Sequence, residues 1–327
     1  MALHPWLEFD RARTVDAIAR AMREAVLTTL SRKGCVVAVS GGIDSSVCAA
    51  LAAKALGTGK VFALILPEKD SSPASRSLGE TLCVHLGVAH EVKDIAPTLD
   101  AIGCYRWRDD AIRSIFPDYG ERWKSKIVIT QNLLEADRYN FFRIVVETPD
   151  GNRMEKRLPL SAYLQIVAAT NFKQRIRKAL EYFHADRLNY AVVGTPNRLE
   201  YDQGFFVKNG DGSADVKPIA HLYKSQVYEL GRYLGLPDEI CAATPTTDTY
   251  SLEQGQDEFY FVLPYDRMDI VLFGLNGGRS AEEVGAEVGL SGEQVARVYR
   301  DIRTKRNTTR PLHLKPILVE PVPGIGE

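Results

Sequence analysis

A run of apolar residues near the N-terminus passes directly into two glycines and then into an alanine-rich segment. It reads VVAVSGGIDSSVCAALAAKALG over residues 36–57. A continuous apolar run is typical of a parallel strand covered on both faces, and an alanine-rich segment after a glycine turn is typical of a helix. The start of a helix presents backbone N–H groups and a positive dipole end. The stretch therefore predicts a strand, a turn that binds an anion, and a helix.

The same alternation continues along the chain. Strand-like apolar runs occupy residues 35–40, 61–66 and 190–194. Helix-like segments lie at residues 10–30, 45–56, 77–86 and 162–183. This order predicts an α/β fold, a doubly wound parallel sheet with helices on both faces.

The pattern changes between residues 103 and 159, which we interpret as an excursion inserted into the sheet. Two extended runs there flank Asp150-Gly151, a dipeptide typical of a β-hairpin. We expect residues 1–310 to form a single domain that includes the excursion. The proline-rich residues 311–327 are expected to form an extended tail.

Two capping-box patterns near the C-terminus, Ser280-x-x-Glu283 and Ser291-x-x-Gln294, predict a pair of helices. Such a pair can read DNA, but 41 basic and 42 acidic residues give a net charge of -1, so nucleic-acid and membrane-surface partners are not expected. Five scattered cysteines indicate reduced thiols and no zinc site. Without a leader pattern or a long apolar segment, we expect a cytoplasmic protein.

The glycine turn also indicates which anion it binds. A Walker A loop would need a lysine, and a dinucleotide fingerprint would need a third glycine where Ser45 stands. Asp44 lies within the turn and would repel phosphate unless a divalent cation lay between them. The turn therefore predicts a metal-bridged polyphosphate, with Ser40, Ser45 and Ser46 as further hydroxyl donors, although a structural turn capped by Asp44 would also explain the string.

A second block, at residues 192–237, contains further candidate residues. Glu200 could be a second oxygen ligand for the cation at Asp44. The remaining candidates are Lys208 and Lys224 for phosphates, and Asp211 or Asp215 for ribose hydroxyls or an amide. Taken singly, surface salt bridges would explain each of them equally well.

Both blocks resemble one known family. The turn Ser40-Gly41-Gly42-Ile43-Asp44-Ser45 resembles the Ser-Gly-Gly-x-Asp-Ser loop of the ATP pyrophosphatases. The second block is similar to that of the ammonia-dependent NAD synthetases, which reads Gly-Thr-x-x-x-x-Glu, Gly-Phe-Phe-x-Lys-x-Gly-Asp-Gly-x-x-Asp and Leu-x-Lys. The resemblance implies an ATP-dependent, amide-forming ligase. It would adenylate the carboxylate of nicotinic acid adenine dinucleotide (deamido-NAD) and release pyrophosphate, and ammonia would then displace AMP to give NAD.

The resemblance also implies roles for particular residues. Asp44, Glu200 and Lys224 would be catalytic, with Asp44 and Glu200 holding Mg²⁺. ATP would contact Ser40, Gly41, Gly42, Asp44, Ser45, Ser46, Thr195, Lys224 and Thr246. Deamido-NAD would contact Arg175, Lys208, Asp211, Asp215 and Lys305.

The family is usually a homodimer, so we expect one here. Because residue 2 is Ala2 and little of the chain lies outside the synthetase-like core, free ammonia or a separate glutaminase subunit is the expected nitrogen source. The chain departs from the family pattern at Pro196-Asn197 and at Thr304. The alternatives are therefore a related amide ligase acting on another carboxylate, or a non-catalytic nucleotide-binding regulator.

Overall fold

The fold is organised around a parallel sheet in a computed structural model that describes residues 3–129, 141–243, 250–252, 255 and 260–324. Its strand order is β3-β2-β1-β7, and Val36 of the central strand β1 pairs with Phe62 on one side and Val192 on the other. The strands are β1 (Cys35–Ala38), β2 (Val61–Ile65), β3 (Ala89–Val92) and β7 (Ala191–Val193). The predicted parallel sheet is confirmed, and β3 is an additional edge strand.

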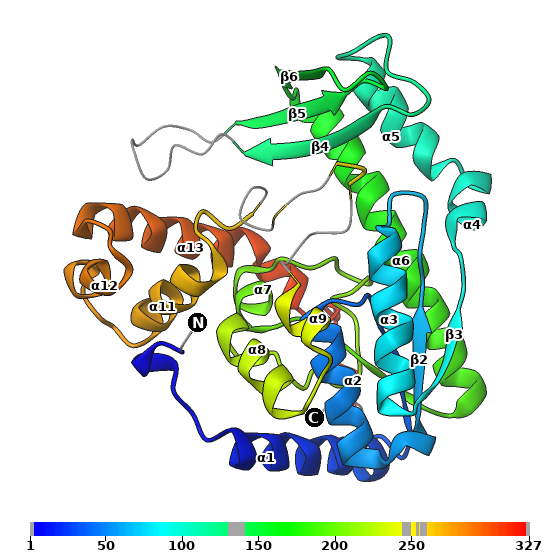
Figure 1. Cartoon of the computed structure of the whole chain (residues 1–327), viewed down its shortest axis with the longest axis vertical. Coiled ribbons are helices and arrows are strands. Elements are labelled where there is room, and N and C mark those ends of the chain that lie inside the picture. Colours follow the sequence, from blue (N-terminus) through cyan, green and yellow to red (C-terminus); the bar gives the residue numbers. More distant parts are fainter. Residues whose placement is uncertain (1–2, 130–140, 244–249, 253–254, 256–259, 325–327) are drawn as a thin grey trace.

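Helices cover both faces of this sheet, as predicted (Figure 1). Val37 of β1 packs in the core on one face of the sheet, with α1 (Arg11–Glu24), α2 (Ile43–Leu56), α3 (Pro73–Leu86) and α8 (Lys224–Tyr233). Its neighbour Val36 packs in the core on the opposite face, with α4 (Ala96–Ala101), α5 (Cys104–Arg113) and α6 (Leu160–Leu188). This alternation explains why β1, β2 and β7 are apolar on every residue.

The later part of the excursion forms a second, antiparallel sheet that lies over the start of α6 (Figure 1), whereas its first helix, α5, packs on the parallel sheet. Its strands are β4 (Lys124–Ile129), β5 (Phe142–Glu147) and β6 (Arg153–Arg157). The predicted hairpin is confirmed: β5 and β6 are joined by a turn in which Gly151 has φ +86° and Thr148 N donates to Asn152 O at 2.9 Å. Strand β4 was not predicted from the sequence.

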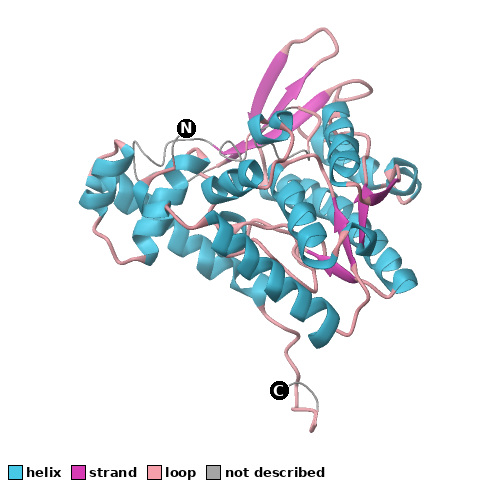
Figure 2. Ribbon diagram, turned by 60° about the horizontal axis from the view of Figure 1, so that its bottom comes forward, coloured by secondary structure: helices cyan, strands magenta, loops and turns pink. Residues whose placement is uncertain are grey.

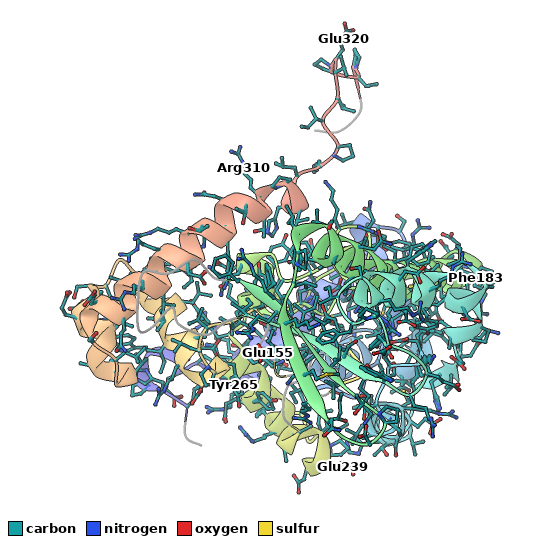
Figure 3. All side chains as sticks on the ribbon, turned by 90° about the horizontal axis from the view of Figure 1, so that it is seen from above. Glu155, Phe183, Glu239, Tyr265, Arg310 and Glu320 are labelled. Carbon is teal, nitrogen blue, oxygen red and sulfur yellow. The ribbon has the colours of Figure 1, made fainter. Side chains whose placement is uncertain are left out.

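Three helices near the C-terminus pack on one another, and both predicted capping boxes are present. These helices are α11 (Tyr265–Asn276), α12 (Ala281–Val288) and α13 (Gly292–His313). Helix α13 continues through Pro311, so the exposed tail begins at Leu314, later than expected, and projects away from the body (Figures 2 and 3).

The remaining elements are short. They are α7 (Arg198–Gln203), α9 (Asp238–Ala242), the 3-10 turns η1 (Pro5–Leu7) and η3 (Thr58–Lys60), and the π-helical turn η2 (Ala25–Thr29). Among the helices described, none has both the length and the apolar character needed to cross a bilayer.

Candidate functional site

A cavity of about 1280 Å³ opens beyond the carboxyl ends of β1, β2 and β7. Strand β1 has β2 as its neighbour along one edge and β7 along the other, so the strand order reverses between β1 and β7. Ligands of doubly wound folds bind at such a switch point. The sequence-predicted residues that line the cavity are Ser40, Gly41, Gly42, Asp44, Ser45, Thr195, Glu200, Asp211, Lys224 and Lys305. Thr246 lies outside the described residues.

The glycine turn has the conformation that an anion site needs. Gly41 has φ +80°, and a Cβ there would lie 2.6 Å from Ser75 O, so only glycine fits. Helix α2 begins directly after Gly42, and no described side chain caps its first turn. The N–H groups of that turn therefore remain available to an anion at the cavity.

The serine hydroxyls of the turn shape it from within. Ser45 Oγ accepts from Ser40 N at 3.2 Å and donates to Gly42 O at 3.0 Å. Ser46 Oγ donates to the same carbonyl at 2.8 Å, is fully buried, and does not line the cavity. Ser46 therefore lies behind the turn and does not face the cavity, where the resemblance implies a contact with ATP.

The three predicted catalytic residues meet at the end of the turn. Lys224 Nζ donates to Asp44 Oδ2, and the lysine is only 2% exposed. Asn197 joins them, since its side chain donates to Asp44 Oδ1 at 3.2 Å and its backbone N donates to Glu200 Oε2 at 3.0 Å. Asn197 is one of the departures from the family pattern, and it is the residue that links the two carboxylates.

The charges of this group depend on one another. Burial and the neighbouring Asp44 carboxylate raise the pKa of Glu200 to about 8. Burial opposes the charge of Lys224, but Asp44 and Glu200 outweigh it and raise the pKa of the ammonium. The two carboxyl groups come from separate elements, and they line one cavity together with the Lys224 ammonium.

This donor set fits Mg²⁺. The described residues contain no cluster of three or more His, Cys, Asp or Glu side chains suited to a metal ion. Mg²⁺ commonly binds through one or two carboxylates together with substrate phosphates and waters, so Asp44 and Glu200 are a sufficient protein contribution.

Helix α11 holds Lys224 in place through a residue whose role was not predicted. Asp269 accepts hydrogen bonds from Lys224 N at 3.2 Å and from Ser225 N at 2.7 Å, and it is completely buried. Burial raises its pKa to about 7. Asp269 thereby caps α8 and fixes the direction in which the Lys224 side chain leaves the helix.

The far end of the cavity also carries charged groups. Asp211 accepts from Val207 N at 2.8 Å, and burial raises its pKa. Lys178 and Glu181 of α6 form a buried ion pair of 2.6 Å on the same cavity wall. This pair was not predicted from the sequence, although its i, i+3 spacing on a helix is a readable signal.

Lys305 of α13 reaches the cavity from the opposite side. Its Nζ donates to Asp301 Oδ2 and to Tyr260 O, both at 2.6 Å. Burial lowers the pKa of this ammonium.

Three predicted substrate residues lie outside the cavity, on exposed surface. Arg175 Nε donates to Lys208 O at 3.2 Å, and Lys208 Nζ donates to Pro311 O at 2.9 Å. Asp215 accepts from Val192 N at 2.7 Å. The structure therefore brings Arg175 and Lys208 together but does not bring them to the phosphate turn.

Comparison with known proteins gives consistent matches. The family model for NAD synthase matches residues 14–113 and 131–310. The NH(3)-dependent NAD(+) synthetase of Rhizobium meliloti (strain 1021) is 60% identical over 98% of this chain and 95% of its own. That of Thermotoga maritima is 35% identical over 78% of this chain and 86% of its own.

Solved structures share the fold. The structure of NMN synthetase from Francisella tularensis has a TM-score of 0.65 at 22% identity and covers 95% of this chain and 99% of its own. The NH3-dependent NAD synthetase from Campylobacter jejuni has a TM-score of 0.62 at 21% identity and covers 96% of this chain and 100% of its own.

Proposed function

The chain belongs to the NAD synthase family, and on that premise we propose that it makes NAD from deamido-NAD, ATP and ammonia. The observation that carries the proposal is the group of Asp44, Glu200 and Lys224 at the glycine turn, on the wall of one large cavity. A binding module would need the turn but not two carboxylates and a buried ammonium directed at the same point.

In the adenylation step, the turn and the first N–H groups of α2 would hold the ATP phosphates. Asp44 and Glu200 would hold Mg²⁺, which when bound supplies positive charge that offsets the charge of the phosphates. The carboxylate of deamido-NAD would attack the α-phosphorus, and the bond to the pyrophosphate would break. Lys224 is fixed by Asp44 and by the cap on α8, so its ammonium can stabilise the leaving pyrophosphate without reorganising.

In the second step, ammonia would attack the carbonyl carbon of the acyl adenylate, and AMP would leave. The attacking nitrogen must lose a proton as the amide forms. Asp211 is a suited acceptor because it lines the cavity and because burial raises the pKa of its carboxyl.

The exposed positions of Arg175, Lys208 and Asp215 support a homodimer in which these residues bind the dinucleotide beside a second copy of the chain. Phe183, on the same helix as Arg175, is 58% exposed and is available to such an interface (Figure 3). Dilution to monomer should then weaken deamido-NAD binding. An affinity independent of protein concentration would contradict the dimer.

We propose free ammonia, or a separate glutaminase subunit, as the nitrogen source, and the cytoplasm as the location. All five cysteines are buried free thiols, which suits a reducing compartment.

The test is an assay with ATP, Mg²⁺, ammonium and deamido-NAD in which AMP, pyrophosphate and NAD are followed separately. We expect the three products in equal amounts. If deamido-NAD gives no NAD but another carboxylate supplied in its place gives pyrophosphate, the chain is a related amide ligase. Release of ADP and phosphate would refute the proposed reaction.

A further inference from the structure

The segment between β2 and α3, residues 66–72, forms the cavity wall beside the phosphate turn. Leu66, Pro67 and Lys69–Ser72 line the cavity. Because β2 pairs with β1, this segment and the turn leave the sheet side by side, and the start of α3 closely approaches Gly41. The position of the segment therefore sets the space available to a nucleotide on the turn.

A buried cluster of charges holds this segment from behind. Lys173 of α6, 2% exposed, donates to Glu68 Oε1 at 3.0 Å and to Asp70 Oδ2 at 2.6 Å. Arg108 of α5 donates to the same oxygen of Asp70 and to Asp109 Oδ1 at 2.8 Å. Burial alone would raise the pKa of Asp70, but Lys173 and Arg108 lower it, so the carboxylate stays charged and bound.

The backbone of the segment is held by the same two helices. Tyr105 of α5 donates its hydroxyl to Glu68 Oε2 at 2.8 Å and accepts from Lys69 N at 3.2 Å. Arg177 of α6 donates from Nε to Leu66 O at 3.0 Å. The segment therefore depends on α5 and α6 for its position.

Tyr105, Arg108 and Lys173 do not themselves line the cavity. The contacts by which they reach the cavity wall are those to the segment that they hold. We propose that Arg108 and Lys173 are positioning residues for ATP, which act by fixing Glu68 and Asp70 and, through them, the wall at Lys69–Ser72. The proposal rests on the proposed function, because it takes the nucleotide on the turn to be ATP.

The main test compares Arg108→Met, Arg108→Lys and the unaltered chain. Binding of ATP with Mg²⁺ is measured by calorimetry in the absence of the acid, and KM for ATP, KM for ammonium, kcat and the melting temperature are measured as well. For Arg108→Met we expect about a tenfold rise in the Kd and KM for ATP, with KM for ammonium changed by less than about twofold. Arg108→Lys retains a cation and should recover part of the affinity for ATP.

Arg11→Met is the matched control. Arg11 donates to Glu229 Oε2 at 2.8 Å and ties α1 to α8, and neither residue lines the cavity. This variant should lower the melting temperature while leaving the Kd for ATP unchanged.

A milder variant covers the case in which Arg108→Met does not fold. Tyr105→Phe removes only a hydroxyl, and it should raise the Kd for ATP about threefold. If Tyr105→Phe and every folded Arg108 variant bind ATP as tightly as the unaltered chain, the positioning role is wrong while the proposed function stands. If the unaltered chain binds no ATP, both are overturned.

Discussion

Replacing Gly41 by alanine separates two effects at the phosphate turn. The positive φ of Gly41 costs an alanine roughly 1–2 kcal/mol. In addition, the new Cβ would lie 2.6 Å from Ser75 O and 2.8 Å from Leu78 Cβ, so the start of α3 has to move. Overpacking of this kind costs about 1–3 kcal/mol. We expect Gly41→Ala to lower the free energy of unfolding by about 2–5 kcal/mol in total.

Two other glycines supply the controls. Gly289 has φ +66° in the left-handed helical region, and a Cβ there would meet nothing within 4 Å, so Gly289→Ala should show the backbone cost alone. Gly42 has φ -79°, and the nearest atom to a Cβ there is Ser40 Oγ at 3.5 Å, so Gly42→Ala should cost little. Urea unfolding gives the three values, and calorimetry with ATP and Mg²⁺ gives the binding loss, which we expect for Gly41→Ala and not for Gly289→Ala. If Gly41→Ala destabilises the chain no more than Gly289→Ala and still binds ATP, the close approach of α3 to the turn is not a constraint.

Four further sets of variants probe the site. Lys224→Met leaves Asp44 without its buried partner, so unfolding in urea should show a loss of about 3–5 kcal/mol and pyrophosphate release should stop; a stable, active variant would contradict the ion pair. Asn197→Ala removes the cap of α7 and the contact to Asp44. Thermal unfolding should show the loss of the cap as about 1 kcal/mol, and the pyrophosphate assay should show the loss of the contact as slower pyrophosphate release. Lys208→Ala should chiefly raise KM for deamido-NAD, whereas Asp44→Ala should abolish pyrophosphate release; equal effects on both quantities would refute the division. Asp269 has a folded pKa of about 7 against 3.8 in the unfolded chain, so it keeps its proton in the folded chain where the unfolded chain has lost it. That stabilisation is complete below about pH 4 and is lost as the pH rises to 7, so the free energy of unfolding should fall by on the order of 4 kcal/mol over that range. The fall should be absent in Asp269→Asn, and urea unfolding as a function of pH measures it.

The sequence predicted those parts of the fold and site that depend on neighbouring residues. The strands β1, β2 and β7 are continuous apolar runs because both of their faces are covered. The edge strand β3 reads Ala-His-Glu-Val and is half exposed, so it lacks that signal. Likewise, the turn before α2 could be identified because its glycines and Asp44 lie within one short stretch.

Contacts between distant residues could not be predicted in this way. Asp44 and Lys224 were both candidates, but their ion pair joins residues 180 positions apart, and only the packing of α8 beside α2 brings them together. The cluster at Asp70 is a stronger case, because it combines the segment after β2 with α5 and α6.

Asn197 shows how a departure from a family pattern can be a replacement rather than a loss. From the sequence, the departure at Pro196-Asn197 is a reason to consider an amide ligase that acts on another carboxylate. In the structure, Asn197 Oδ1 accepts from Glu200 N at 3.3 Å, and the backbone N of Asn197 donates to the Glu200 carboxylate, so the two residues form a capping box that orients Glu200. The same side chain also donates to Asp44. Asn197 thus holds Asp44 through its neutral side-chain amide and Glu200 through its backbone N–H without adding a third negative charge, whereas an aspartate at this position would place one beside Asp44.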